Sequence, residues 1–171
     1  NQRRPVNAPM QLPRPAEVIV VGLGEEGKLR VGDLSGTVCA GVISWVQRMV
    51  EQGEQESARL ELASTLIGSG GIGMSAGQAA QAIAVGVREA NERLSQRKWP
   101  QIGELVLIEL YLDRASEAWR ALKVLSTSAP GFYQIADAIR NEPGALVRPL
   151  DAGYRGAAYD LISAESDKDK N

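Results

Sequence analysis

Short apolar runs alternate with long amphipathic segments along most of the chain. Three runs, Val18–Val21, Arg59–Ile67 and Leu105–Leu112, have the length and composition of β-strands. After each run comes a segment in which apolar residues recur at steps of three and four, the period of an amphipathic helix. Such alternation is typical of right-handed crossover connections, which produce a parallel sheet. The sequence therefore predicts an α/β fold, with three layers (α/β/α) around a mostly parallel, mixed sheet.

The predicted helices have recognisable starts and inward faces. The second helix opens at Ser75, which can form a capping box with Gln78. Asp113 is placed to cap the third helix. Cys39 lies on the apolar stripe of the first helix and is interpreted as a small buried hydrophobe. The predicted stripes are Leu34, Val38, Val42, Val46 and Met49 in the first helix, and Ala76, Ala80, Ile83, Val87, Ala90 and Leu94 in the second.

The two ends of the chain differ in composition from the middle. Residues 1–17 are rich in proline and are predicted to be an extended lead-in or linker. Residues 166–171, SDKDKN, are predicted to be a disordered tail. Between them, residues 18–165 have the length of one compact domain, in which weaker strand candidates follow at 132–139 and 158–163. The chain begins without methionine, which we interpret as the start of a piece of a longer protein.

Composition narrows the possible functions. The formal net charge is −2, so nothing global favours nucleic acid or an anionic membrane as partner. The sequence contains no histidine, which removes histidine-based nucleophilic mechanisms and histidine metal sites. One cysteine and the lack of a long apolar run indicate a cytoplasmic setting. We expect no enzymatic activity, no catalytic residue, no metal site and no cofactor.

A glycine-dense loop between the second strand and the second helix is the main candidate site. Its pattern Gly68-x-Gly70-x-x-Gly73 matches the dinucleotide fingerprint, but the position of the acid expected about 20 residues later falls near Arg93, still inside the predicted helix. The same stretch approaches a P-loop, but Met74 stands where the lysine is needed. Free amides at the start of a helix still favour an anion. The predicted anion-binding residues are Gly68, Ser69, Gly70, Gly71, Ile72, Gly73 and Met74, with Gly22 and Gly24 of the earlier turn GLGEEG beside them.

The loop resembles the phosphate-binding loop of macro domains. Ser69, Gly70 and Gly73 match that pattern, whereas Ile72 replaces its aromatic residue and Ser75 its proline. The stretch VIVVGLG is similar to a macro-domain strand and to the GLG strand in the amino-terminal domain of leucyl aminopeptidases, which shares that fold. The resemblance spans about residues 18 to 122 and rests on the order and spacing of elements.

The departures from the macro family shape the functional expectation. The adenine-reading aspartate, the Asn-Ala-Asn stretch and the catalytic loop of that family have no counterpart in residues 1–17. The resemblance therefore implies a degenerate, non-catalytic macro-like interaction module of a larger bacterial multidomain protein, whose partners are other domains of the same polypeptide or another protein. The alternative is a module that binds a phosphate-containing or ADP-ribose-like molecule through Gly68–Met74. An ADP-ribose hydrolase is the third possibility.

Overall fold

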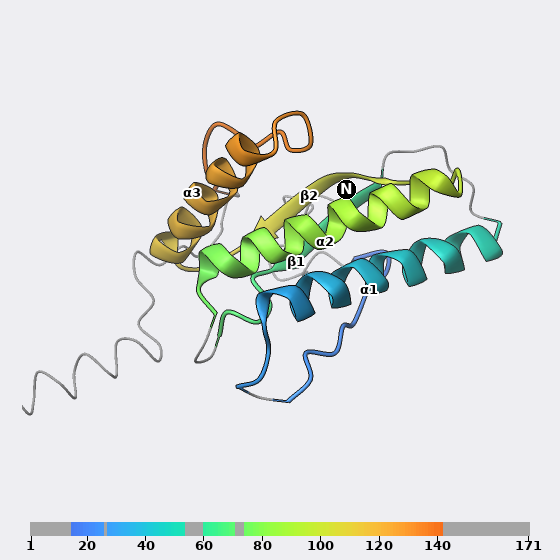
Figure 1. Cartoon of the computed structure of the whole chain (residues 1–171), viewed down its shortest axis with the longest axis horizontal. Helices are drawn as coiled ribbons and strands as arrows, with labels where there is room; N and C mark the ends of the chain where they lie inside the picture. The colour runs from blue at the N-terminus through green and yellow to red at the C-terminus, as the bar shows by residue number, and fades with distance from the viewer. Residues whose placement is uncertain (1–14, 26, 54–59, 71–73, 142–171) are drawn as a thin grey trace, which may run out of the picture.

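In the part of the chain that the structure describes, the protein is a small α/β fold with three helices and a parallel pair of strands (Figure 1). The computed structural model describes residues 15–25, 27–53, 60–70 and 74–141. This confirms the predicted α/β class and the parallel pairing. Along the described chain the elements are α1 (Val31–Glu51), β1 (Leu60–Thr65), α2 (Ala76–Gln96), β2 (Ile102–Ile108) and α3 (Leu112–Ser128).

The strands β1 and β2 are parallel because α2 carries the chain from the end of one back to the start of the other. The register begins with Leu60 beside Ile102, and an irregularity there leaves Gly103 as an extra residue in β2. The Asn91 side chain of α2 fixes this start. Its amide donates to the Ile102 carbonyl at 2.8 Å, and its oxygen accepts from the Ile102 N–H at 2.8 Å.

The helices cover one face of this sheet. Leucine side chains at alternate positions, such as Leu62 and Leu105, pack against the helical core, and Leu107 also reaches the cluster that includes α3. Their neighbours Ala63 and Thr65 point the other way and are exposed. The central helix is α2, which contacts α1 on one side and α3 on the other (Figure 1). None of the helices in the described ranges is long and apolar enough to cross a membrane.

The predicted stripes of the first two helices are confirmed. The α1 stripe, including Cys39, and all six predicted residues of the α2 stripe are buried, apart from Met49, which is half-buried. The two helices meet most closely at Gly86, where a Cβ atom would lie 2.5 Å from the Ser35 carbonyl oxygen and 2.9 Å from Cβ of Val38. A glycine is therefore required at this crossing.

The first predicted strand, Val18–Val21, is wrong. These residues pair with no strand in the described part of the chain, and the side chains of Val18 and Val20 are 73% and 87% exposed. The second and fourth side chains lie against Gly41 of α1, where the missing side chain leaves room for them. Close by, the Trp45 indole donates a hydrogen bond to the Glu17 carboxylate. This continuous apolar run is therefore a strap, a segment without strand partners in the described chain that packs one half-buried side on α1.

The third predicted strand lies at residues 102–108 instead of Leu105–Leu112. Its end is set by Glu109, whose carboxylate accepts the backbone N–H groups of Leu110 and Tyr111 and turns the chain into α3. Asp113 therefore lies in the first turn of α3, and Tyr111 occupies the N-cap position.

The strand expected at 132–139 is also absent from these described residues, which instead lie along α2 and α3. The Trp119 indole donates to the Ala136 carbonyl at 3.0 Å, and Arg88 donates to the Tyr133 hydroxyl at 3.1 Å. The strand expected at 158–163, the predicted tail 166–171 and residues 1–14 of the predicted lead-in 1–17 lie outside the described residues.

Candidate functional site

The glycine loop turns sharply as soon as β1 ends. The Ile67 N–H donates to the Thr65 carbonyl at 2.8 Å, and the Ser69 N–H donates to the Leu66 carbonyl at 3.2 Å. Gly68 has φ +82°, and a Cβ atom there would lie 2.8 Å from a methyl of Leu29. Both the backbone conformation and the close packing therefore require glycine, as expected for part of this loop.

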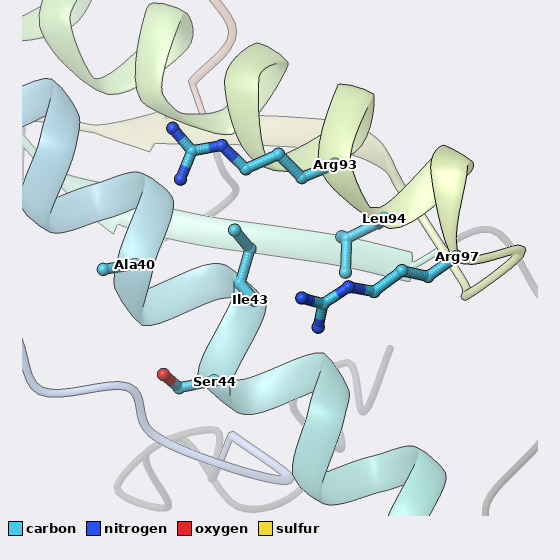
Figure 2. A pocket seen from close by; sticks show the side chains of 6 residues that line it. All are labelled: Ala40, Ile43, Ser44, Arg93, Leu94 and Arg97. Atoms are coloured by element: carbon cyan, nitrogen blue, oxygen red, sulfur yellow. The ribbon is translucent and has the colours of Figure 1, made fainter.

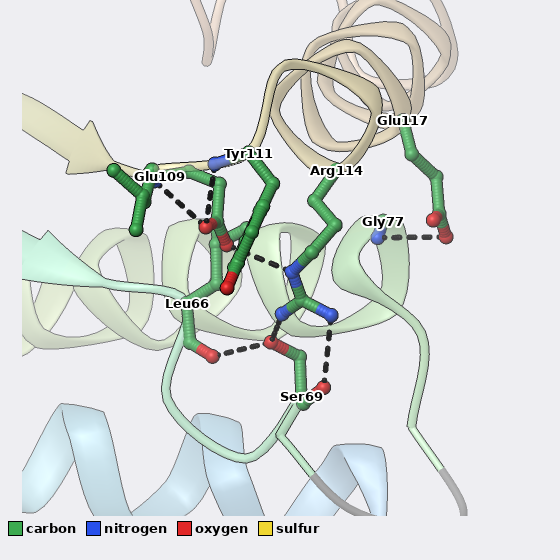
Figure 3. A network of polar contacts seen from close by, with 8 residues as sticks. Leu66, Ser69, Gly77, Glu109, Tyr111, Arg114 and Glu117 are labelled. Atoms are coloured by element: carbon green, nitrogen blue, oxygen red, sulfur yellow. Dashed lines mark hydrogen bonds and ion pairs between the residues drawn. The ribbon is translucent and has the colours of Figure 1, made fainter. Parts of the chain in front are cut away.

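Ser69 connects the loop to α3 through a buried arginine (Figure 3). The Ser69 hydroxyl donates to the Leu66 carbonyl at 2.5 Å and accepts from Nη2 of Arg114 at 2.6 Å. Nη1 of the same arginine donates to the Ser69 carbonyl at 3.3 Å. Ser69 is 4% exposed, so this contact is shielded from water. A sequence segment 45 residues away therefore holds the loop in place.

Glu109 completes this network at the end of β2. One carboxylate oxygen accepts the N–H groups of Leu110 and Tyr111 at 2.7 and 3.1 Å, and the other accepts from Nε of Arg114 at 3.0 Å. The side chains of Arg114 and Glu109 are only 10% and 14% exposed, so their attraction is weakly screened by solvent. The ends of β1 and β2 and the start of α3 are thus joined by one set of charge-assisted hydrogen bonds.

The start of α2, where free amides favour an anion, is contacted by an acidic side chain of the same protein. Ser75 is the N-cap and forms the predicted capping box with Gln78. In the same first turn, the Gly77 N–H donates to the Glu117 carboxylate of α3 at 3.1 Å (Figure 3). A carboxylate at a helix amino terminus neutralises the positive end of the helix dipole. One amide in the first turn of α2, just after the predicted anion-binding loop, is therefore engaged by Glu117.

The remaining predicted site residues differ in their burial. Met74 is 5% exposed and belongs to the hydrophobic core, with its sulfur 3.6 Å from the Cβ position of Gly68. Gly70, Gly22 and Gly24 are exposed, and a Cβ atom added at any of them would meet nothing within 4 Å. Gly71, Ile72 and Gly73 lie outside the described residues.

Three residues of this site, Glu109, Arg114 and Glu117, were not among the residues predicted from the sequence. The sequence holds one clue to these residues, the position of Arg114. It lies four residues before Ala118 and therefore adds a charged residue to the inward stripe of α3. A charge on a buried stripe needs a partner, because an unpaired charge is costly to remove from water. That requirement points to a nearby carboxylate such as Glu109.

In the described part of the chain, neither a metal-binding cluster nor a reactive thiol is found. There, no set of three or more histidine, cysteine, aspartate or glutamate side chains is arranged to hold a metal ion. Burial raises the pKa of the Cys39 thiol, which keeps the sulfur protonated and unreactive at neutral pH.

Comparisons with known proteins gave no match to a protein-family model, a curated protein or a solved structure.

Proposed function

We propose that this chain is a non-catalytic, macro-like interaction module of a larger bacterial protein and that it binds through the uncovered face of its sheet. The observation that carries the proposal is a parallel sheet with helices against one face in the described residues. Parallel sheets are normally covered on both faces, because their strands are apolar on both sides. A neighbouring domain or partner protein would supply the second helical layer, and this would complete the three-layer arrangement expected from the sequence.

The uncovered face has a composition that suits such a partner. Ala63 lies beside Val106, and Thr65 lies beside Ile108, whose side chain is 54% exposed. At the other end of the strands, two acids lie side by side at positions 61 and 104, and both are exposed. A helix with an apolar centre and a basic residue toward the acidic end matches this pattern.

Binding of a phosphate-containing molecule by the glycine loop receives less support. Ser69 is engaged by Arg114, and the Gly77 amide is engaged by Glu117, so an incoming anion would have to displace groups that already satisfy one another. The same contacts give no support to an ADP-ribose hydrolase. The interaction module is therefore the first function to test.

The test uses a photo-crosslinking amino acid placed at Ile108 or, as a matched control, at Val124 on α3. Both side chains are large, apolar and well exposed, but only Ile108 lies on the sheet. A protein crosslinked in cells is identified, purified and titrated against the wild-type chain, Ile108→Asp and Val124→Asp. We expect Ile108→Asp to weaken binding by about tenfold or more, and Val124→Asp to change it by less than about twofold.

Equal losses in the two variants, or crosslinks from position 124 alone, would contradict binding through the sheet face. Circular dichroism of both variants would establish that they remain folded.

A further inference from the structure

A shallow groove runs between α1 and α2 on the side of the helices opposite the sheet (Figure 2). Its volume is about 290 Å³, and its lining combines apolar and basic side chains. The groove follows from the packing of the two helices, which are closest at Gly86 and carry larger side chains in the turns that follow. The lining residues are Ala40, Ile43 and Ser44 of α1, with Arg93 and Leu94 of α2 and Arg97 just after it.

The two arginines give the groove its chemistry. Arg93 and Arg97 are four residues apart, so they project from successive turns on one side of α2. Figure 2 shows both side chains extending in the same direction, with Ile43 of α1 between them. The Arg97 guanidinium lies 5.0 Å from the centre of the Trp99 ring, which supports its flat face and leaves its N–H edge available for hydrogen bonds.

These guanidinium groups lack an acidic partner within the described ranges. Glu92 is on the same helix but pairs with Arg88, and Glu89, one turn before Arg93, forms no ion pair with it. Both arginines are exposed, so their guanidinium N–H groups are accessible to a ligand. The Ser44 hydroxyl on the opposite wall adds a further polar group.

From this arrangement we infer that the groove binds an acidic peptide segment whose carboxylates meet Arg93 and Arg97 while an apolar side chain rests on Ile43 and Leu94. The charge of the two arginines selects a ligand with carboxylates. The apolar floor and the open shape suit a peptide better than a small ion, which would contact only the rim. This surface is separate from the sheet face of the proposed function, so the two can be tested independently.

The experiment is a titration of the full chain with a fluorescent, end-capped synthetic peptide of alternating glutamate and leucine. The same peptide with lysine in place of glutamate, and inorganic phosphate, serve as comparison probes. We expect the glutamate peptide to bind, with an affinity that falls when salt rises from about 0.05 to 0.5 M. Charge reversal in Arg93→Glu/Arg97→Glu should reduce the affinity by about tenfold or more.

Two further variants make the test specific. Ser44→Glu places a carboxylate opposite the arginines and should block the peptide, whereas the fold should persist because Ser44 is exposed. Arg120→Glu/Arg140→Glu makes the same change in net charge at exposed positions outside the groove and should leave binding within about twofold.

Three results would overturn the inference: equal loss in the control pair, equal binding of the lysine peptide, or no binding of the glutamate peptide at about millimolar concentration. Phosphate binding as tight as that of the glutamate peptide would also overturn it, because the apolar floor would then play no part.

Discussion

Replacing Arg114 with methionine removes the guanidinium that joins the glycine loop to the end of β2 but keeps an apolar side chain of similar length. The arginine side chain is 10% exposed and contacts Glu109 at 3.0 Å and the Ser69 hydroxyl at 2.6 Å. Removing one member of a buried ion pair costs about 3 to 5 kcal/mol, because the other charge remains buried without its partner. Glu109 keeps two backbone N–H donors, so we expect the lower end of that range, about 3 kcal/mol.

Urea denaturation followed by circular dichroism measures this cost. We expect Arg114→Met to lower the midpoint with an unchanged slope, which identifies a change in stability rather than in the surface exposed on unfolding. Arg120→Met, at an exposed position of the same helix, should stay within about 0.5 kcal/mol of the wild type. Glu109→Gln should cost less in the Arg114→Met background than alone, with a coupling of about 1 to 3 kcal/mol. Equal stability of the two arginine variants would refute the view that Arg114 holds the loop.

Two further predictions test the packing of α1 on α2. Gly86→Ala should destabilise the protein by about 1 to 3 kcal/mol, because the new methyl group would lie 2.5 Å from the Ser35 carbonyl oxygen. At Gly36 nothing lies near the added methyl group, so Gly36→Ala should stabilise the protein by up to about 1 kcal/mol. Thermal unfolding measures both changes, and a shift of the same sign in both would contradict the close crossing. Burial raises the pKa of the Cys39 thiol in the folded protein. Above about pH 8.5 the thiol ionises in the unfolded chain but stays protonated in the folded one, so the free energy of unfolding should fall as pH rises through this range. Alkylation of Cys39 should accordingly be slow until the chain is unfolded in urea, and rapid labelling of the folded protein would show that the thiol is accessible.

The parts of the fold that depend on local pattern could be predicted from the sequence. The apolar stripes of α1 and α2 and the capping box at Ser75 depend on residues three or four apart, so their signals lie within one helix. The prediction of a strand at Val18–Val21 is wrong, because a continuous apolar segment can be either a buried strand or a strap with one packed side. The packing partner that decides between them, Gly41, is 20 residues away from Val21.

The candidate site could be predicted only in its location. The glycines marked the turn between β1 and α2, and Gly68 has the positive φ that such a turn needs. The described contacts of Ser69 and of the start of α2 come from α3, since Arg114 reaches Ser69 and Glu117 reaches Gly77 across 45 and 40 residues of sequence. No local pattern encodes these contacts, because they depend on how α3 packs beside α2.

The central claim is that Ser69 and the Gly77 amide already have partners within the protein, which favours the proposed interaction module over a module that binds phosphate. Amide NMR spectra of the wild-type chain, recorded during a titration with ADP-ribose, test it most directly. We predict that the Ser69 and Gly77 amide signals stay in place up to about 1 mM ligand, because Arg114 and Glu117 already occupy their surroundings. Saturating shifts of both signals at micromolar ADP-ribose would contradict the account and identify the loop as a ligand site.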